Sequence, residues 1–419
     1  MRIFVLLCFL PFFHLLADWP QYHGPFFDKS TKNPLPITLG SLTKENIIWK
    51  CPTPLGFSSF SISSDRAFTL VAEEDEDGLL RETCIALDLS TGQRIWHKQL
   101  SLASYGHGGG NAGTQENSGG DGPRSTPSVH QGLVFIYDSA MALHCLSSDT
   151  GKQIWKIDVI KEHEGRNITW KNASSPLLIN DLVIICGGGS GQSLIGVEQK
   201  TGKVRWENGD ETLTHATPAY ASIHGQEQVL FLCRSGLISI DPETGRELWT
   251  QEFPFKVSTA SSPVVANDLV FCSAGYGVGA AVFRISQKAG SWESKMLWRK
   301  RNELMNHWST PLQYKGHIYG IFGFKEYGKA PLQCIDLATG TIQWSKKGFG
   351  QGNLIRSGDT LLALSDDGQL VTVSATPRAY HELGRMKFLD GKCWSTPTLS
   401  KNYLLARSTK EGGCILLKK

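Results

Sequence analysis

The chain has 419 residues, of which 10% are aromatic and 19% charged, and its formal net charge is +3. This mild charge excludes the strongly basic character of many nucleic-acid-binding proteins, so we expect no nucleic-acid partner. The 44 glycines and 18 prolines, without any long amphipathic helical pattern, indicate a turn-rich all-β chain.

The N-terminal segment has the features of a signal peptide. Arg2 precedes an apolar stretch from Ile3 to Leu16 that is too short to cross a bilayer, and Ala17 is a small residue suited to cleavage. We therefore predict a signal peptide over residues 1–17 and an N-terminal extension over residues 18–41. The mature protein is expected to be periplasmic or secreted, without a membrane span.

A Thr-Gly pair followed by Trp, five residues after the Thr, occurs five times. In most copies an acceptor such as Asp88 stands three residues before the Thr, where it can bind the amides of a turn. Glycine supplies the positive φ of that turn, and the Trp projects from the next strand with a large apolar area to bury against a neighbouring repeat. The copies begin at Thr91, Thr150, Thr201, Thr244 and Thr339.

A second signature, Ser or Thr followed by Pro, opens six of the repeat units. Proline suits the first residue of a strand, where its missing N–H costs no ladder hydrogen bond. The prolines are Pro127, Pro176, Pro218, Pro263, Pro311 and Pro397.

When the two signatures are placed end to end along the chain, they mark eight units of four strands each. The last unit ends at Lys419 before any Trp, whereas Trp49 lies in a strand with no unit before it. We therefore predict one eight-bladed β-propeller over residues 42–419, with four-stranded antiparallel blades closed by the N-terminal strand. The tryptophans expected to dock neighbouring blades are Trp49, Trp96, Trp155, Trp206, Trp249, Trp298 and Trp344.

The cysteines recur at equivalent places in separate units, which is typical of small buried apolar residues. The closing unit is the exception, because it holds Cys51, Cys393 and Cys414. Two alternatives stay open there: a Cys51–Cys414 disulfide that locks the ring, or free buried thiols. The chain has no Cys-x-x-Cys pair, and we expect no metal site.

In a propeller, the residues just before each inner strand surround one mouth of the central channel. Aromatic residues, Arg and His gather at these positions, and such side chains commonly anchor a partner. A Gly-rich loop over residues 106–122 is expected to lie over this mouth and to deliver Arg124 to it. The expected mouth residues are Phe57, Arg124, Asn172, His215, His307, Trp308, Gln351 and Trp394.

The repeat resembles the pyrroloquinoline-quinone-like propeller repeat, which quinoprotein alcohol dehydrogenases share with the outer-membrane assembly factor BamB. The resemblance covers about residues 42–419. The segment from Asp18 to Pro25 also resembles the start of secreted propellers of planctomycete and verrucomicrobial bacteria, most of which have no assigned activity. A fold shared by enzymes and scaffolds does not choose between the two.

The resemblance to quinoproteins implies a disulfide between adjacent cysteines and a Ca²⁺ site built from Glu, Asn and Asp, neither of which has a matching motif here. We therefore expect a non-catalytic, monomeric binding protein with no cofactor and no catalytic residue. Its expected partner is a peptide, protein or glycan at the channel mouth. The alternative is a quinoprotein dehydrogenase-like enzyme with pyrroloquinoline quinone and calcium.

Overall fold

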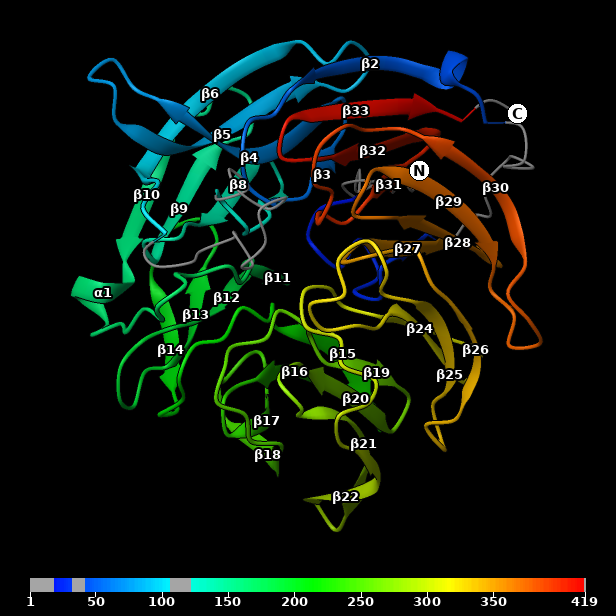
Figure 1. Cartoon of the computed structure of the whole chain (residues 1–419). Coiled ribbons are helices and arrows are strands. Elements are labelled where there is room, and N and C mark those ends of the chain that lie inside the picture. Colours follow the sequence, from blue (N-terminus) through cyan, green and yellow to red (C-terminus); the bar gives the residue numbers. More distant parts are fainter. Residues whose placement is uncertain (1–18, 32–41, 106–121, 418–419) are drawn as a thin grey trace, which may run out of the picture.

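Each repeat unit forms a four-stranded antiparallel sheet, and eight such sheets surround a central axis (Figure 1). The computed structural model describes residues 19–31, 42–105 and 122–417. The predicted all-β fold, an eight-bladed propeller of four-stranded blades, is confirmed. The predicted signal peptide and nearly all of the Gly-rich loop lie outside the described residues.

The first four blades follow one another along the chain. Blade 1 contains β3 (Ser61–Ser63), β4 (Arg66–Glu74), β5 (Leu80–Asp88) and β6 (Arg94–Leu102). Blade 2 contains β7 (Ser128–His130), β8 (Leu133–Tyr137), β9 (Ala142–Ser147) and β10 (Gln153–Asp158). Blade 3 contains β11 (Leu177–Ile179), β12 (Leu182–Cys186), β13 (Leu194–Glu198) and β14 (Val204–Asn208). Blade 4 contains β15 (Ala219–Ile223), β16 (Gln226–Leu232), β17 (Gly236–Ile240) and β18 (Glu247–Glu252).

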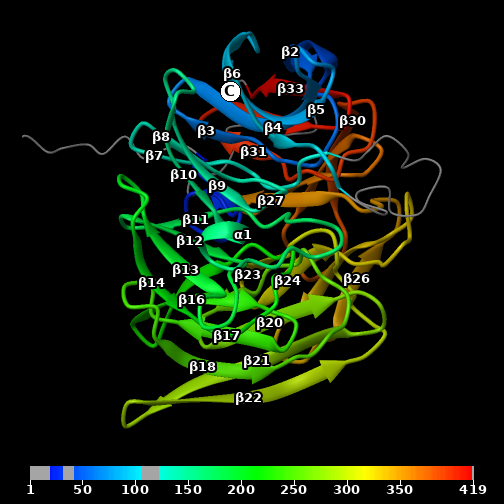
Figure 2. The ribbon, with the colours of Figure 1, turned by 90° about the vertical axis from the view of Figure 1, so that its left-hand side faces the viewer.

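Blades 5 to 7 continue the ring. Blade 5 contains β19 (Val264–Ala266), β20 (Leu269–Ala274), β21 (Gly279–Lys288) and β22 (Ser291–Lys300). Its β21–β22 hairpin is the longest described and lies at the lower edge of Figure 2. Blade 6 contains β23 (Leu312–Tyr314), β24 (His317–Ile321), β25 (Leu332–Asp336) and β26 (Ile342–Lys346). Blade 7 contains β27 (Asn353–Ser357), β28 (Thr360–Leu364), β29 (Gln369–Ser374) and β30 (Glu382–Lys387), and β1 (Ser30–Thr31) adds to it in parallel with β27.

Blade 8 joins the two ends of the chain, as predicted. It contains β31 (Thr398–Ser400), β32 (Tyr403–Arg407) and β33 (Glu411–Leu416), and β2 (Ile47–Pro52) is its outer strand. Trp49 of β2 lies opposite Cys414 of β33, whereas Cys51 lies opposite Gly412. Both cysteines are free, so the closing blade has no disulfide and the free-thiol alternative holds. The described helices are short: α1 (Val159–Glu162) and the 3₁₀ turn η2 (Lys44–Asn46).

A buried arginine strengthens this closure. Arg407 of β32 is 0% exposed. Its guanidinium donates to the carbonyl oxygens of Thr53 at 3.0 Å, Leu55 at 2.5 Å and Leu70, and to Thr69 Oγ1 at 3.0 Å. One side chain thereby ties blade 8 to β4 of blade 1 and to the chain that leaves β2.

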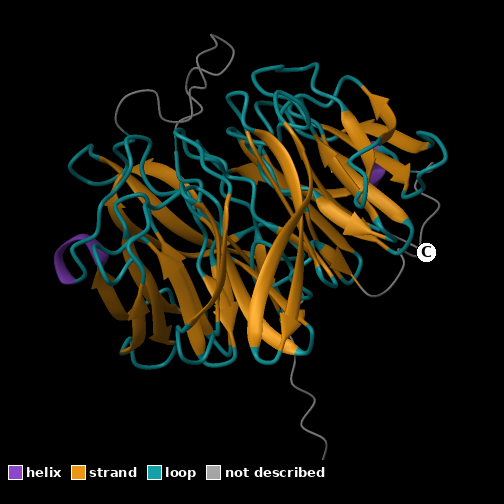
Figure 3. Ribbon diagram, turned by 90° about the horizontal axis from the view of Figure 1, so that it is seen from below, coloured by secondary structure: helices purple, strands orange, loops and turns teal. Residues whose placement is uncertain are grey.

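The strands run between two loop-rich faces (Figure 3). In a four-stranded antiparallel blade the first and third strands run the same way, so the turn after the third strand lies at the face opposite the start of the first. The loops that open the blades therefore gather on one face, called the mouth face here, and the Thr-Gly turns gather on the other.

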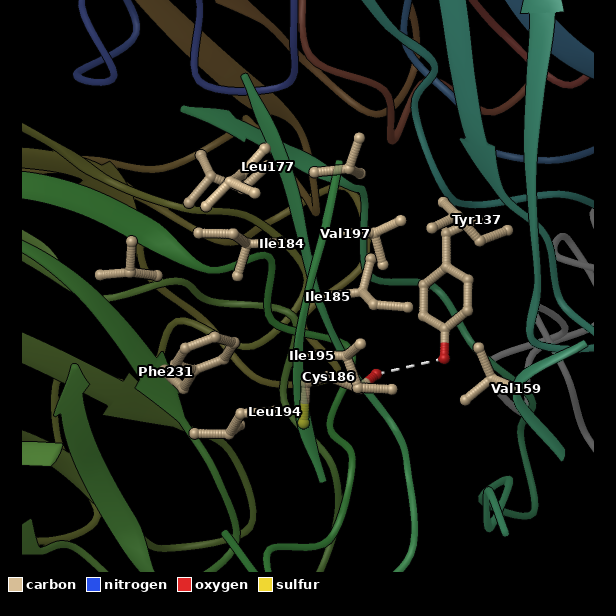
Figure 4. Close-up of a cluster of buried hydrophobic side chains, with 14 of the residues drawn as sticks. Tyr137, Val159, Leu177, Ile184, Ile185, Cys186, Leu194, Ile195, Val197 and Phe231 are labelled. Atoms are coloured by element: carbon tan, nitrogen blue, oxygen red, sulfur yellow. Dashed lines mark hydrogen bonds between the residues drawn. The ribbon is translucent and has the colours of Figure 1, made fainter. Parts of the chain in front are cut away.

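The blades pack face to face, because their middle strands are apolar on both sides. All five residues of β12 are buried, whereas in β14, the outer strand, only Trp206 is. Figure 4 shows this core around blade 3, with Tyr137 of blade 2 on one side and Phe231 of blade 4 on the other. The Tyr137 hydroxyl donates to the carbonyl oxygen of Cys186 at 3.2 Å, so the polar end of this buried ring is satisfied.

Most of the predicted docking tryptophans bond to the following blade. The indole Nε1–H of six of them donates at 2.7–2.9 Å to a backbone carbonyl there: Trp49 to Leu89, Trp96 to Ser148, Trp155 to Gln199, Trp206 to Pro242, Trp298 to Leu337 and Trp344 to Thr376. Trp249 differs, because it donates to Gln228 Oε1 of its own blade at 2.7 Å. Blade 5, which follows it, has the long β21–β22 hairpin in place of a Thr-Gly turn.

The Ser/Thr-Pro signature also connects blades. Each of the six prolines stands immediately before its strand and not, as predicted, as its first residue. The hydroxyl before four of these prolines, and that of Ser59 before Phe60 in blade 1, accepts a backbone N–H from the blade before it. These five bonds join Thr396 to Ser59, Ser59 to Thr126, Thr126 to Ser175, Ser175 to Thr217 and Ser262 to Thr310 at 2.8–3.0 Å. These bonds link blades 8, 1, 2, 3 and 4 in succession, and blade 5 to blade 6.

Candidate functional site

A cavity of about 280 Å³ lies at the channel mouth, where the loops that open the blades converge. Six of the eight predicted mouth residues line it: Phe57, Arg124, His215, His307, Trp308 and Trp394. They come from five different blade-opening loops, since His307 and Trp308 are neighbours in the loop before blade 6, and the ring geometry brings these loops together. The remaining lining is Tyr22, Ser59, Trp170, Ala173, Ser175, Thr217, Val257, Ser258, Ala260, Tyr276 and Lys325.

The other two predicted mouth residues do not line the cavity. Asn172 is 1% exposed, and its amide donates to the carbonyl oxygens of Tyr137 at 3.1 Å and Asp138 at 3.2 Å. Gln351 is 4% exposed, and its backbone N–H donates to Asp366 Oδ2 at 3.2 Å. Asn172 thus holds the opening loop of blade 3 in place, and its neighbour Ala173 faces the cavity instead.

Stacked aromatic rings form one wall of the cavity. Trp394 stacks on Phe57 with a centroid distance of 4.8 Å, on Trp308 at 5.4 Å and on Tyr327 at 5.9 Å. Trp394 is only 7% exposed, so it supports the wall, while the half-buried Phe57 and Trp308 offer most of the surface. Flat apolar faces of this kind suit an aromatic ring or a sugar ring.

Two neutral histidines contribute hydrogen-bonding groups to the cavity. His215 Nε2 lies 2.9 Å from the carbonyl oxygen of Lys171, which assigns the proton to Nε2 and leaves Nδ1 as an acceptor. His307 Nδ1 accepts the Gly275 N–H at 3.2 Å, which leaves Nε2–H as a donor. Burial lowers the pKa of each to about 3, helped by the charge of Arg124 at His215 and of Lys325 at His307. Both rings are therefore neutral at neutral pH.

Two cations complete the lining, and none of the described lining residues is a carboxylate. The Arg124 guanidinium donates to the carbonyl oxygen of Trp170 and lies over the Tyr105 ring, 5.3 Å from its centroid. Tyr105 is itself fixed, because its hydroxyl donates to the buried Glu82 at 2.7 Å. Lys325 Nζ lies over the Tyr276 ring, 5.3 Å from its centroid. The cavity therefore favours a ligand with negative charge.

The N-terminal segment 19–31 closes the floor of the cavity, which the sequence did not predict. Trp19 pairs with Ile62 of blade 1, the Pro20 carbonyl accepts from Val129 of blade 2, and Gln21 Oε1 accepts the N–H of Leu178 in blade 3. The segment thus crosses the channel from blade to blade, and Tyr22 becomes the floor residue. Burial raises the pKa of Tyr22, an effect that the hydroxyls of Thr310 and Thr396 oppose.

The described lining of the cavity does not fit the calcium site that the quinoprotein resemblance implies. Calcium binds to several converging oxygen ligands, usually including carboxylates, and the described lining supplies no carboxylate. Within residues 19–31, 42–105 and 122–417, no group of three or more His, Cys, Asp or Glu side chains is arranged to hold a metal ion. We therefore derive no catalytic step through such a group.

Comparison with known proteins places this chain among propellers of one family. A sequence profile described as "Outer membrane protein assembly factor BamB" matches residues 80–346, more than half of the chain. The chain belongs to the BamB family. BamB of Shewanella oneidensis is 24% identical over 300 residues, which cover 67% of this chain and 71% of that protein. Tetrathionate hydrolase of Acidithiobacillus ferrooxidans is also 24% identical, over 253 residues that cover 60% of this chain but only 42% of the hydrolase.

Solved structures extend the likeness in fold beyond this family. Quinohemoprotein alcohol dehydrogenase from Comamonas testosteroni superposes with a TM-score of 0.65, covering 96% of this chain and 80% of that one, at 11% sequence identity. At this identity the likeness concerns the fold alone. Among the described residues, no helix has the length and apolar character needed to cross a membrane.

Proposed function

We propose that this member of the BamB family is a non-catalytic, periplasmic or secreted binding protein that acts as a monomer and holds a segment of a partner protein at the channel mouth. The observation that carries the proposal is the cavity itself: a stacked aromatic wall, two cations and two neutral histidines around a space closed below by Tyr22. Aromatic residues and Arg, set in a concave pocket, are the usual anchors of protein recognition.

The chemistry of the lining favours binding over turnover. An efficient general base has a pKa near the working pH, whereas His215 and His307 have pKa values lowered to about 3. Each also has one ring nitrogen engaged by the backbone. Four hydroxyls of the lining accept backbone N–H groups and are therefore engaged in structural hydrogen bonds: those of Ser59, Ser175, Thr217 and Ser258.

The proposal is tested by capture of partners from an envelope extract with the purified mature protein as bait. The Phe57→Ala/Trp308→Ala variant removes the surface that the aromatic wall offers, while Trp394 stays to support it. The matched control is Ile154→Ala/Ile342→Ala, which removes exposed apolar side chains from the outer strands of blades 2 and 6. We expect one captured species that the control retains and the cavity variant loses. Identical capture by all three proteins would overturn the proposal.

A quinoprotein-type oxidoreductase is the second candidate. One observation favours it: the flat face of Trp308 lies in the same cavity as Arg124, an arrangement that also suits a flat, carboxylated ring. The test is the absorbance and intact mass of the purified mature protein, followed by an assay of alcohol oxidation with added quinone and calcium. A bound quinone together with turnover would replace the binding proposal with this one.

A further inference from the structure

A second hollow of about 500 Å³ adjoins the mouth cavity, and we call it the basic groove. It is formed by loops of blades 3 and 4 and by the loops that lead into blades 3, 4 and 5, all on the mouth face. It shares Trp170 and Ser258 with the cavity, so the two hollows form one continuous surface.

Three exposed cations line this groove: Arg166, Arg234 and Lys256. Within the described part of the chain, none of the three side chains makes a hydrogen bond or an ion pair. By contrast, seven arginines elsewhere pair with carboxylates: Arg66, Arg81, Arg94, Arg205, Arg284, Arg356 and Arg385. The groove thus gathers cations whose hydrogen-bonding capacity is left for a ligand.

The two acids of the groove are engaged by its own loops. Asp210 Oδ1 accepts from Ser190 Oγ at 2.5 Å and from the Gly191 N–H at 2.8 Å, and these bonds lower its pKa. Glu211 Oε2 accepts from Ser235 Oγ at 2.8 Å. Neither carboxylate forms an ion pair with the three cations, so three cations against two carboxylates leave the groove a net charge of +1 and leave the cationic side chains available to a ligand.

We propose that the groove and the cavity together bind an extended acidic segment of a partner protein, with an aromatic side chain in the cavity. The carboxylates of that segment lie against Arg166, Arg234 and Lys256, and Arg can hold a carboxylate through two parallel hydrogen bonds. This inference rests on the proposed function and names the chemistry of its partner.

The lining favours a peptide over an anionic polysaccharide. A polysaccharide presents similar rings along its whole length, so its binding site would have aromatic side chains for stacking along both the cavity and the groove. Here the aromatic wall is confined to the cavity, and Trp170 is the only aromatic residue among those described in the groove. An occupant with one ring at one end and charges along the rest matches this division.

The inference is tested with synthetic peptides and the full mature protein, by fluorescence anisotropy at low and high salt. The probe has one Trp followed by alternating Glu and Gly. Control peptides carry Gln for every Glu, or Ala for the Trp, and an oligogalacturonate represents anionic glycans. We expect the acidic Trp peptide to bind about tenfold or more tightly than either control peptide, with affinity falling as salt rises. Equal binding of the Glu and Gln peptides, or tighter binding of the oligogalacturonate, would overturn the inference.

Two variants separate this inference from the proposed function. Arg234→Glu/Lys256→Glu reverses charge in the groove, and its matched control is Lys203→Glu/Arg246→Glu, at the Thr-Gly turns of blades 3 and 4 on the opposite face. We expect about tenfold weaker peptide binding for the groove variant and a change within about twofold for the control. If Phe57→Ala/Trp308→Ala loses binding but the groove variant does not, the acidic-segment inference fails while the cavity proposal stands. If only the groove variant loses binding, the cavity proposal fails and with it the placement of the aromatic side chain.

Discussion

Trp206 and Gly245 lie in neighbouring blades, and the close contact between them explains why both residue types recur in the repeated signature. The Trp206 indole lies so close over Gly245 that a Cβ at residue 245 would stand 2.5 Å from the ring. Gly245 also has a φ of +69°, a conformation that suits glycine. The same relationship joins Trp49 with Gly92 and Trp96 with Gly151. The two ends of the repeated signature are therefore the two halves of a contact between successive blades.

Trp206→Ala is predicted to lower the free energy of unfolding by about 3–5 kcal/mol, because it removes a large buried ring from a packed contact. The measurement is denaturant unfolding followed by fluorescence and circular dichroism. A loss below about half a kcal/mol would mean that the ring does not dock the blades.

Gly245→Ala is predicted to destabilise more than Gly225→Ala, in unfolding measurements made under the same conditions. Both glycines have a positive φ, but a Cβ at Gly225 meets no atom within 4 Å. This control therefore measures only the cost of placing a residue with a side chain at a positive φ. The steric term at Gly245 should largely vanish in the Trp206→Ala background, as expected for residues in contact. Equal losses for the two glycine variants would contradict the contact.

Arg407→Met is predicted to cost about 3 kcal/mol or more, because several buried acceptors of blades 1 and 8 lose a charged donor. The control Arg378→Met changes an exposed arginine and should stay within about 0.5 kcal/mol. Thermal unfolding monitored by circular dichroism checks both. An unchanged midpoint for Arg407→Met would show that the ring closes without this clamp.

Glu82 gives the protein a pH dependence that can be assigned. Burial, with the neighbouring Asp138 charge, raises the pKa of Glu82 from 4.5 to about 7. A folded-state pKa above the unfolded one means that Glu82 contributes stability fully below about pH 4.5 and loses it as the pH rises through about 7. Glu82→Gln should therefore gain stability relative to wild type as the pH rises across this window, whereas the exposed Glu293→Gln should not. A stability difference that is flat with pH, in midpoints measured from pH 5 to about 9, would refute this assignment.

Most of what could be predicted from the sequence followed from the spacing of the repeat. Residues at equivalent places in each unit must lie at equivalent places in the ring, so the blade count, the closure at Trp49 and six cavity residues followed from spacing. Asn172 and Gln351 were placed at the cavity wrongly, because side chains in the loops before the strands do not keep the alternation of a strand.

Other features had no repeat to reveal them. The segment from Trp19 to Thr31 contacts blades far away in sequence, and no copy of it exists to show where it lies. Arg407 gives no sign in the sequence that its partners are carbonyls of another blade. Arg166, Arg234 and Lys256 stand in three loops of unrelated sequence, and only the ring brings them to one groove.

Site-specific photo-crosslinking tests the binding function of the channel mouth most directly. Tyr276 lines the cavity and is 45% exposed, so a photoreactive amino acid there reports what enters. The same group at Ile154, 50% exposed on an outer strand, is the control. We predict that irradiation of cells links residue 276 to one discrete partner protein, that residue 154 does not give this product, and that Trp308→Ala abolishes it. Products that are the same at both positions, or that persist in Trp308→Ala, would contradict a binding site at the mouth.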